Sequence, residues 1–189
     1  MADKKHIVLG VTGWIAAYKA AELARLMIKK KWEVSVVMTQ AATRFVGELT
    51  FRALTCRPVV LDLFQEAKTW RPTHISMADW ADVFVIAPCT ANVMAKLAHG
   101  LADDALTATA LACAAPLVVA PAMNEKMWIH PATQDNVRIL KKRGVGVVDV
   151  EQGELACGYE GRGRLAALDI IVAAVEKCLK SRSRRTMQS

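Results

Sequence analysis

Short apolar runs that alternate with helical segments are the feature that most restricts how this chain can fold. The runs lie at residues 6–11, 33–38, 83–87 and 117–120. Several of them are uniformly apolar, which is typical of strands buried on both faces of a parallel sheet. Between them, apolar residues recur at helical spacing. The sequence therefore predicts an α/β fold, a three-layer, doubly wound parallel sheet of Rossmann-like or flavodoxin-like type.

The remaining segments complete this pattern. Helices are expected at residues 15–30, 41–55, 75–81, 91–100, 105–114, 133–143 and 168–180. A short strand or an extended piece is expected at 59–63, and a late strand at 145–150. The glycine-rich segment 151–165 is too long for an ordinary connection, and we expect a mobile flap there. Because no repeat or linker interrupts the pattern, residues 1–180 are predicted to form one domain and residues 181–189 a basic tail.

Composition excludes several classes of protein. The chain has 189 residues, of which 53% are hydrophobic, so a substantial core is expected. No apolar run approaches the roughly 18 to 20 residues that span a bilayer, and the N-terminus does not resemble a signal peptide, so a cytoplasmic protein without membrane contact is expected. The five cysteines form no close pair, so no metal site is predicted. The basic tail lacks aromatic residues, which argues against a nucleic-acid partner.

Small and polar residues follow each of the main apolar runs. Thr12 and Gly13 follow the first, Thr39 the second, Thr90 the third and Asn124 the fourth. Ligands of open parallel sheets bind outside the carboxyl ends of the strands, so these residues predict a site. None of these turns carries a lysine or an arginine. A phosphate there would be bound by backbone N–H groups, hydroxyls and helix N-termini.

The residues at the first two strand ends favour a mononucleotide over a dinucleotide. The segment from Gly10 to Gly13 does not match the G-x-G-x-x-G fingerprint. Thr39 stands where a nicotinamide site would have an acidic residue to bind the ribose hydroxyls. FMN therefore fits these residues better than NAD.

Five sequence blocks identify a family. Residues 121–128 read PAMNEKMW, which matches the pattern P-x-M-N-x-x-M-W of one protein family. Four more blocks match that family and occur in its order along the chain, at 10–19, 74–82, 87–98 and 155–158. On these blocks the chain resembles the flavin-dependent cysteine decarboxylases, also called HFCD flavoproteins, over roughly residues 5–175. The resemblance implies an FMN cofactor lined by Thr12, Gly13, Trp14, Ile15, Thr39, Thr90, Ala91, Asn92, Val93 and Ala122. Trp14 departs from the small residue that the family usually has there, and Asp104 departs from the usual asparagine.

The resemblance also implies catalytic and substrate-binding residues. His74 matches the active-site histidine of the family, a residue type that exchanges protons near neutral pH. Cys157, on the glycine-rich segment, matches the proton donor of one branch of the family. Asn124 would bind the substrate carboxylate. The other substrate-binding candidates are Met127, Ala156, Arg162 and Arg164.

The activity implied by the resemblance is FMN-dependent decarboxylation of 4′-phospho-N-pantothenoylcysteine to 4′-phosphopantetheine, in coenzyme A biosynthesis. Cys157 favours this branch, because related peptide cysteine decarboxylases lack that residue and release an oxidised enethiol. Peptide cysteine decarboxylation and a non-enzymatic, flavin-binding regulatory role are the alternatives. Family members form trimers with the flavin at a subunit interface, so a homotrimer or a dodecamer is expected.

Overall fold

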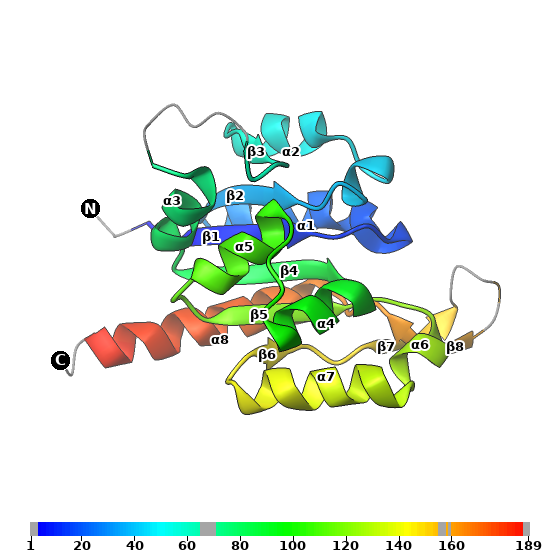
Figure 1. Cartoon of the computed structure of the whole chain (residues 1–189). Coiled ribbons are helices and arrows are strands. Elements are labelled where there is room, and N and C mark those ends of the chain that lie inside the picture. Colours follow the sequence, from blue (N-terminus) through cyan, green and yellow to red (C-terminus); the bar gives the residue numbers. More distant parts are fainter. Residues whose placement is uncertain (1–3, 65–70, 155–157, 159, 187–189) are drawn as a thin grey trace.

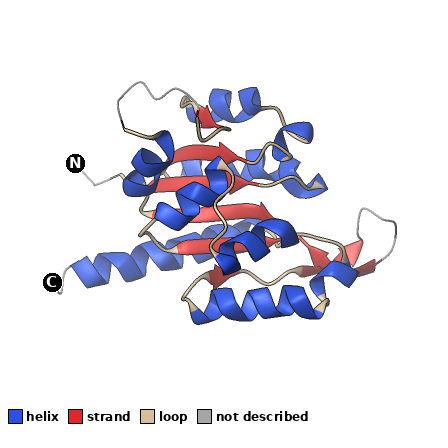
Figure 2. Ribbon diagram, viewed as in Figure 1, coloured by secondary structure: helices blue, strands red, loops and turns tan. Residues whose placement is uncertain are grey.

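The computed structural model describes residues 4–64, 71–154, 158 and 160–186. A six-stranded parallel sheet forms its centre, with the strand order β3-β2-β1-β4-β5-β6 (Figures 1 and 2). The strands are β1 (His6–Val11), β2 (Glu33–Met38), β3 (Val59–Val60), β4 (Val83–Cys89), β5 (Leu117–Pro121) and β6 (Gly146–Val147). The order reverses between β1 and β4, as in doubly wound folds, so the predicted fold class is confirmed.

Helices cover both faces of the sheet, which makes the fold three-layered (Figure 2). One face carries α1 (Tyr18–Lys29), α2 (Glu48–Thr55) and α8 (Leu168–Thr186). The other carries α3 (Thr73–Trp80), α4 (Ala91–His99), α5 (Ala105–Ala112) and α7 (Pro131–Lys142). Among the described residues, no helix has the length and hydrophobicity that crossing a membrane would require.

The core consists of two hydrophobic clusters, one on each face of the sheet. Successive strand residues point to opposite faces, so Ile7 and Leu9 of β1 pack under α1, whereas Val8 faces the other layer. All three side chains have no exposed surface. Burial on both faces explains why the strands read as nearly continuous apolar runs.

Several boundaries differ from the sequence-based expectation. The helix expected at 41–55 is split into a 3-10 turn (Ala42–Arg44) and α2, because Gly47 is extended, with φ −67° and ψ 143°. The expected strands at 59–63 and 145–150 shorten to β3 and β6 at the two edges of the sheet. The segment 151–165 contains an antiparallel hairpin, β7 (Glu151–Glu154) and β8 (Glu160–Arg164). A short helix, α6 (Glu125–Trp128), was not expected.

Candidate active site

The carboxyl ends of β1 and β4 lie side by side where the strand order reverses, and Thr12 joins them. Its buried hydroxyl donates to the carbonyl oxygen of Pro88 at 2.8 Å and accepts from the backbone N–H of Thr90 at 3.1 Å. Ligands of open α/β sheets bind at this position of the fold. Because its single proton is directed to Pro88, Thr12 positions the two strand ends and does not offer a proton to a ligand.

Gly13 lets the chain pass very close to the exit of β2. A Cβ atom built on Gly13 would lie 2.5 Å from the Cβ of Ala41, so no larger residue fits without moving the backbone. Both backbone groups of the next residue, Trp14, are hydrogen-bonded. The backbone N–H of Trp14 donates to the carbonyl oxygen of Thr12 at 3.1 Å, and its own carbonyl accepts from Ala17 at 2.8 Å. These two bonds hold the backbone of Trp14 in the turn between β1 and α1.

Threonine hydroxyls follow β2 and β4. The Thr39 hydroxyl oxygen accepts from the backbone N–H of Ala42 at 3.3 Å, and that of Thr90 accepts from Val93 at 3.3 Å. The second bond caps α4. A hydroxyl that accepts in this way keeps its own proton for donation to a ligand. The N–H groups of Ala91 and Asn92 have no partner within the helix, so they add further donors at its N-terminus.

Cys89, the last residue of β4, ends at the same edge of the sheet. It is fully buried, and burial raises the pKa of its thiol. A thiol in such surroundings stays protonated at neutral pH and is a poor nucleophile. Cys89 therefore acts as a small hydrophobic residue beneath the site.

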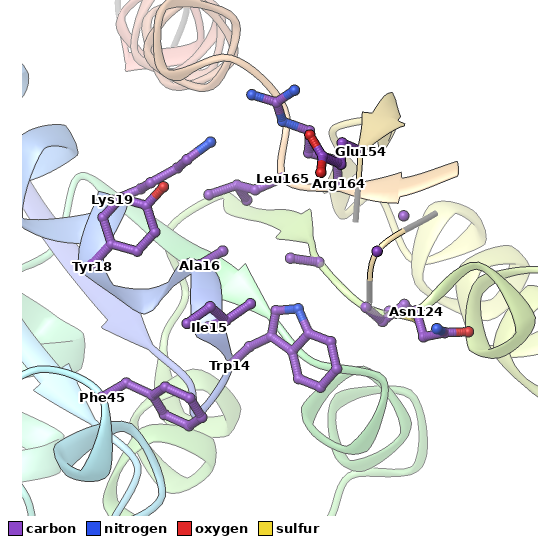
Figure 3. A pocket seen from close by; sticks show the side chains of 14 residues that line it. Trp14, Ile15, Ala16, Tyr18, Lys19, Phe45, Asn124, Glu154, Arg164 and Leu165 are labelled. Carbon is purple, nitrogen blue, oxygen red and sulfur yellow. The ribbon is translucent and has the colours of Figure 1, made fainter. Parts of the chain in front are cut away.

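A cavity of about 690 Å³ opens at the carboxyl ends of the strands (Figure 3). Its walls come from the turn after β1, the start of α1, the residue after the 3-10 turn, the segment after β5, and the hairpin. The predicted residues Trp14, Ile15, Ala122, Asn124 and Arg164 are among those that line it. The other predicted residues in the described part of the chain do not line this cavity: Thr12, Gly13, Thr39, His74, Thr90, Ala91, Asn92, Val93, Met127 and Arg162.

Asn124 lies across the cavity from Trp14 and begins α6. Its side-chain oxygen accepts from the backbone N–H of Lys126 at 2.9 Å. The same amide carries a nitrogen, a donor of the kind that pairs with an acidic ligand. Met127, on α6, has 43% of its surface exposed.

The hairpin rests on the segment that carries Asn124. The backbone N–H of Met123 donates to the carbonyl oxygen of Gly163 at 2.9 Å, and the N–H of Arg162 donates to Oε1 of Glu125 at 2.9 Å. A Cβ atom on Gly163 would lie 2.2 Å from the carbonyl oxygen of Met123, so only glycine fits this contact. The base of the predicted flap is thus bound to the site. Ala156 and Cys157 lie outside the described residues.

His74 lies far from this cavity within one chain. It belongs to α3, which Figure 1 shows beside the amino end of β1. The helix α6 and the hairpin lie at the opposite side, beyond the carboxyl ends of the strands. Its Nδ1 atom is buried and has no hydrogen-bond partner among the described residues. A single chain therefore does not bring His74 and Asn124 together.

Other lining residues were not predicted from the sequence. They include Tyr18, Lys19, Phe45 and Glu154. Lys19 follows Ile15 by four positions, which places the two on the same side of a helical segment, and this spacing could have identified it. Phe45 follows the 3-10 turn and Glu154 ends β7, and only the folded chain brings them to the cavity.

Several known proteins are similar to this chain in sequence. A family model described as Flavoprotein matches residues 1–180. The Coenzyme A biosynthesis bifunctional protein CoaBC of Bacillus subtilis is 45% identical over 177 residues, which are 94% of this chain and 44% of the relative. The chain thus spans less than half the length of that protein. The probable phosphopantothenoylcysteine decarboxylase of Streptococcus mutans is 44% identical over 177 residues, which are 93% of this chain and 99% of the relative.

Solved structures share the fold over most of the chain. A mutant PPC decarboxylase complexed with pantothenoylaminoethenethiol superimposes with a TM-score of 0.82 at 32% identity, covering 92% of this chain and 97% of the other. The FMN binding protein AtHal3 gives a TM-score of 0.80 at 32% identity, covering 95% and 98%. Together with the family model, these similarities show that the chain belongs to the Flavoprotein family.

Proposed function

We propose that this chain catalyses the FMN-dependent decarboxylation of 4′-phospho-N-pantothenoylcysteine to 4′-phosphopantetheine, a step of coenzyme A biosynthesis. The observation that carries the proposal is the similarity to the Streptococcus mutans relative, which extends over 99% of that protein at 44% identity. The match to a PPC decarboxylase that holds pantothenoylaminoethenethiol supports it further. A biosynthetic role of this kind supports the proposal that the protein works in the cytoplasm.

The residues at the strand ends fit FMN. The close approach of Gly13 to Ala41, where a Cβ would lie 2.5 Å from its neighbour, brings the turn after β1 next to the segment that follows Thr39. Thr39 and Thr90 add hydroxyls, and the start of α4 adds N–H groups, so the donors suit a phosphate. Trp14 and Ile15 give the cavity an apolar wall that suits a planar ring. When bound, FMN supplies the reversible two-electron oxidation of the cysteinyl side chain that makes loss of carbon dioxide possible.

The chain's own residues bind the substrate and move protons. Asn124 is proposed to bind the substrate carboxylate through its amide nitrogen, with its orientation fixed by the bond to Lys126 at 2.9 Å. His74 is proposed as the base that assists oxidation of the substrate thiol. Cys157 is proposed as the proton donor that completes the product.

Replacement of Cys157 tests the proton-donor role. The Cys157→Ser variant should still release carbon dioxide but form an oxidised enethiol, one per flavin, because decarboxylation precedes the protonation step and the flavin would then stay reduced. Mass spectrometry separates that species from 4′-phosphopantetheine by two hydrogens. Full conversion to 4′-phosphopantetheine by this variant would refute the role of Cys157.

We further propose that the active site is completed by a second copy of the chain, in a homotrimer or a dodecamer. The separation of α3 from the cavity supports this, because His74 can then come from a neighbouring subunit (Figure 1). Apolar side chains around the cavity mouth also support it. Ile15, Tyr18 and Phe45, which line the cavity, have 48%, 60% and 47% of their surface exposed. A subunit contact would bury these residues.

A further inference from the structure

Lys19 and Arg164 come from distant parts of the chain and meet at one end of the cavity. Lys19 is in the first turn of α1, and Arg164 is the last residue of β8. Both line the cavity. Figure 3 shows the ammonium of Lys19 and the guanidinium of Arg164 reaching toward the same end, away from Trp14 and Asn124.

Within the described part of the chain, neither cation belongs to an ion pair. Glu154 lines the same end of the cavity, but it is not paired with either of them there. The pairing of Lys96 offers a contrast, since its ammonium lies 2.7 Å from Asp103.

Lys19 and Arg164 outnumber Glu154, the one carboxylate among the described residues that line the cavity, so this end carries a net positive charge. A bound anion would neutralise that charge. The arrangement is therefore more favourable with a negatively charged group bound than without one.

The backbone on the hairpin side is held firmly in place. Gly163 immediately precedes Arg164, and its carbonyl oxygen accepts from the N–H of Met123 at 2.9 Å. The Arg164 side chain runs close to Gly153, since a Cβ atom built there would lie 3.1 Å from Nη1. On the other side, Lys19 stands on a helix that is anchored by the fully buried Leu23. The backbone segments that carry Lys19 and Arg164 are therefore both held in place, and both side chains line the same cavity.

We propose that Lys19 and Arg164 form an anion subsite that binds the terminal phosphate monoester of a ligand in the cavity. Guanidinium and ammonium groups are the donors best suited to phosphate oxygens. The subsite rests on the proposed function for the identity of that ligand. Two ligands of the reaction carry such a group, the 4′-phosphate of the substrate and the 5′-phosphate of FMN. The inference places the charge for phosphate binding on α1 and β8, although the turns after the strands carry no lysine or arginine.

Binding measurements on matched ligand pairs test the subsite and separate its two sources. FMN is compared with riboflavin by fluorescence titration, and 4′-phosphopantetheine with pantetheine by calorimetry, on the full chain. In the wild-type protein, at least one phosphorylated ligand should bind more tightly than its partner. The Lys19→Ala and Arg164→Ala variants should each raise the Kd of that ligand about tenfold or more and change the Kd of its partner less than about twofold, because a charge-assisted hydrogen bond is lost.

Two further variants make the result specific. Lys29→Ala removes the same charge from the exposed end of the same helix and should alter neither pair, whereas Arg164→Lys retains the charge and should recover part of the affinity. The inference is overturned if the wild type does not distinguish either pair, if Lys19→Ala and Arg164→Ala weaken both members equally, or if Arg162→Ala alone removes the discrimination. Carbon dioxide release by the wild type is measured separately, so failure of the proposed reaction is distinguishable from failure of the subsite.

Discussion

The backbone N–H of Thr90 donates to the hydroxyl oxygen of Thr12 at 3.1 Å, although the two residues are 78 positions apart in the chain. The same hydroxyl donates to the carbonyl oxygen of Pro88 at 2.8 Å. One buried side chain therefore holds the ends of β1 and β4 together where the order of the strands reverses. The shape of the proposed cofactor site depends on this connection.

Replacement of Thr12 by valine should weaken both folding and cofactor binding. The variant keeps the shape of the side chain but leaves the Pro88 carbonyl and the Thr90 N–H without their partner, which costs about 1–3 kcal/mol of unfolding free energy. Urea unfolding measures the loss, and FMN titration measures the effect on the site. Thr50→Val, at an exposed position of α2, is the matched control and should change the unfolding free energy by less than about 0.5 kcal/mol. Equal stability of the Thr12 and Thr50 variants would contradict the role of Thr12.

Gly13→Ala should displace the turn after β1, because the new Cβ would meet Ala41 at 2.5 Å. We expect a loss of about 1–3 kcal/mol in unfolding free energy and a lower flavin content of the purified protein. Gly47→Ala is the control, since nothing lies within 4 Å of a Cβ at that position. Thermal unfolding and the flavin absorption spectrum compare the two. A Gly13→Ala protein that keeps its full flavin content would show that this close approach does not shape the cofactor site.

Trp14 should bind the ring of the flavin and not its phosphate. Its indole lines the apolar side of the cavity, and an aromatic contact of this kind contributes about 0.5–1.5 kcal/mol, or roughly two- to twelve-fold in affinity. Trp14→Leu should therefore weaken FMN and riboflavin by the same factor. Trp32→Leu, before β2, is the control and should leave both affinities unchanged. Tighter flavin binding by Trp14→Leu would mean that the indole obstructs the site.

The strands and the long helices could be predicted from the sequence because their signals are local. The residues of β1 and β4 are apolar on both faces. Thr90 immediately precedes α4, and its hydroxyl caps the helix at 3.3 Å from the N–H of Val93. The parallel sheet followed from such features, whereas the family followed from the five sequence blocks, and both are confirmed.

Other parts of the structure depend on contacts between distant segments. The hairpin strand β8 has the sequence EGRGR, which has little intrinsic strand propensity, and it forms where Gly163 binds Met123. The helix α6 has four residues, too few to produce a periodic pattern. The convergence of Lys19 with Arg164 likewise depends on where β8 docks. The role of Cys157 stays a prediction.

A mixing experiment tests whether two subunits share one active site. His74→Ala and Asn124→Ala are each expected to lose nearly all activity, since each removes one half of the site. When the two inactive proteins are dissociated and reassembled together, some sites receive an intact His74 from one subunit and an intact Asn124 from another. Carbon dioxide release should then recover to a fraction of the wild-type rate. No recovery in an assembly that light scattering shows to be mixed would contradict a shared site.

The most direct measurement supplies the purified chain with FMN and 4′-phospho-N-pantothenoylcysteine and follows both products. The account predicts a yellow protein that releases carbon dioxide and forms 4′-phosphopantetheine in equal amounts, with the flavin oxidised again at the end. A protein that binds FMN but forms neither product, or that decarboxylates only a peptide ending in cysteine, would contradict it.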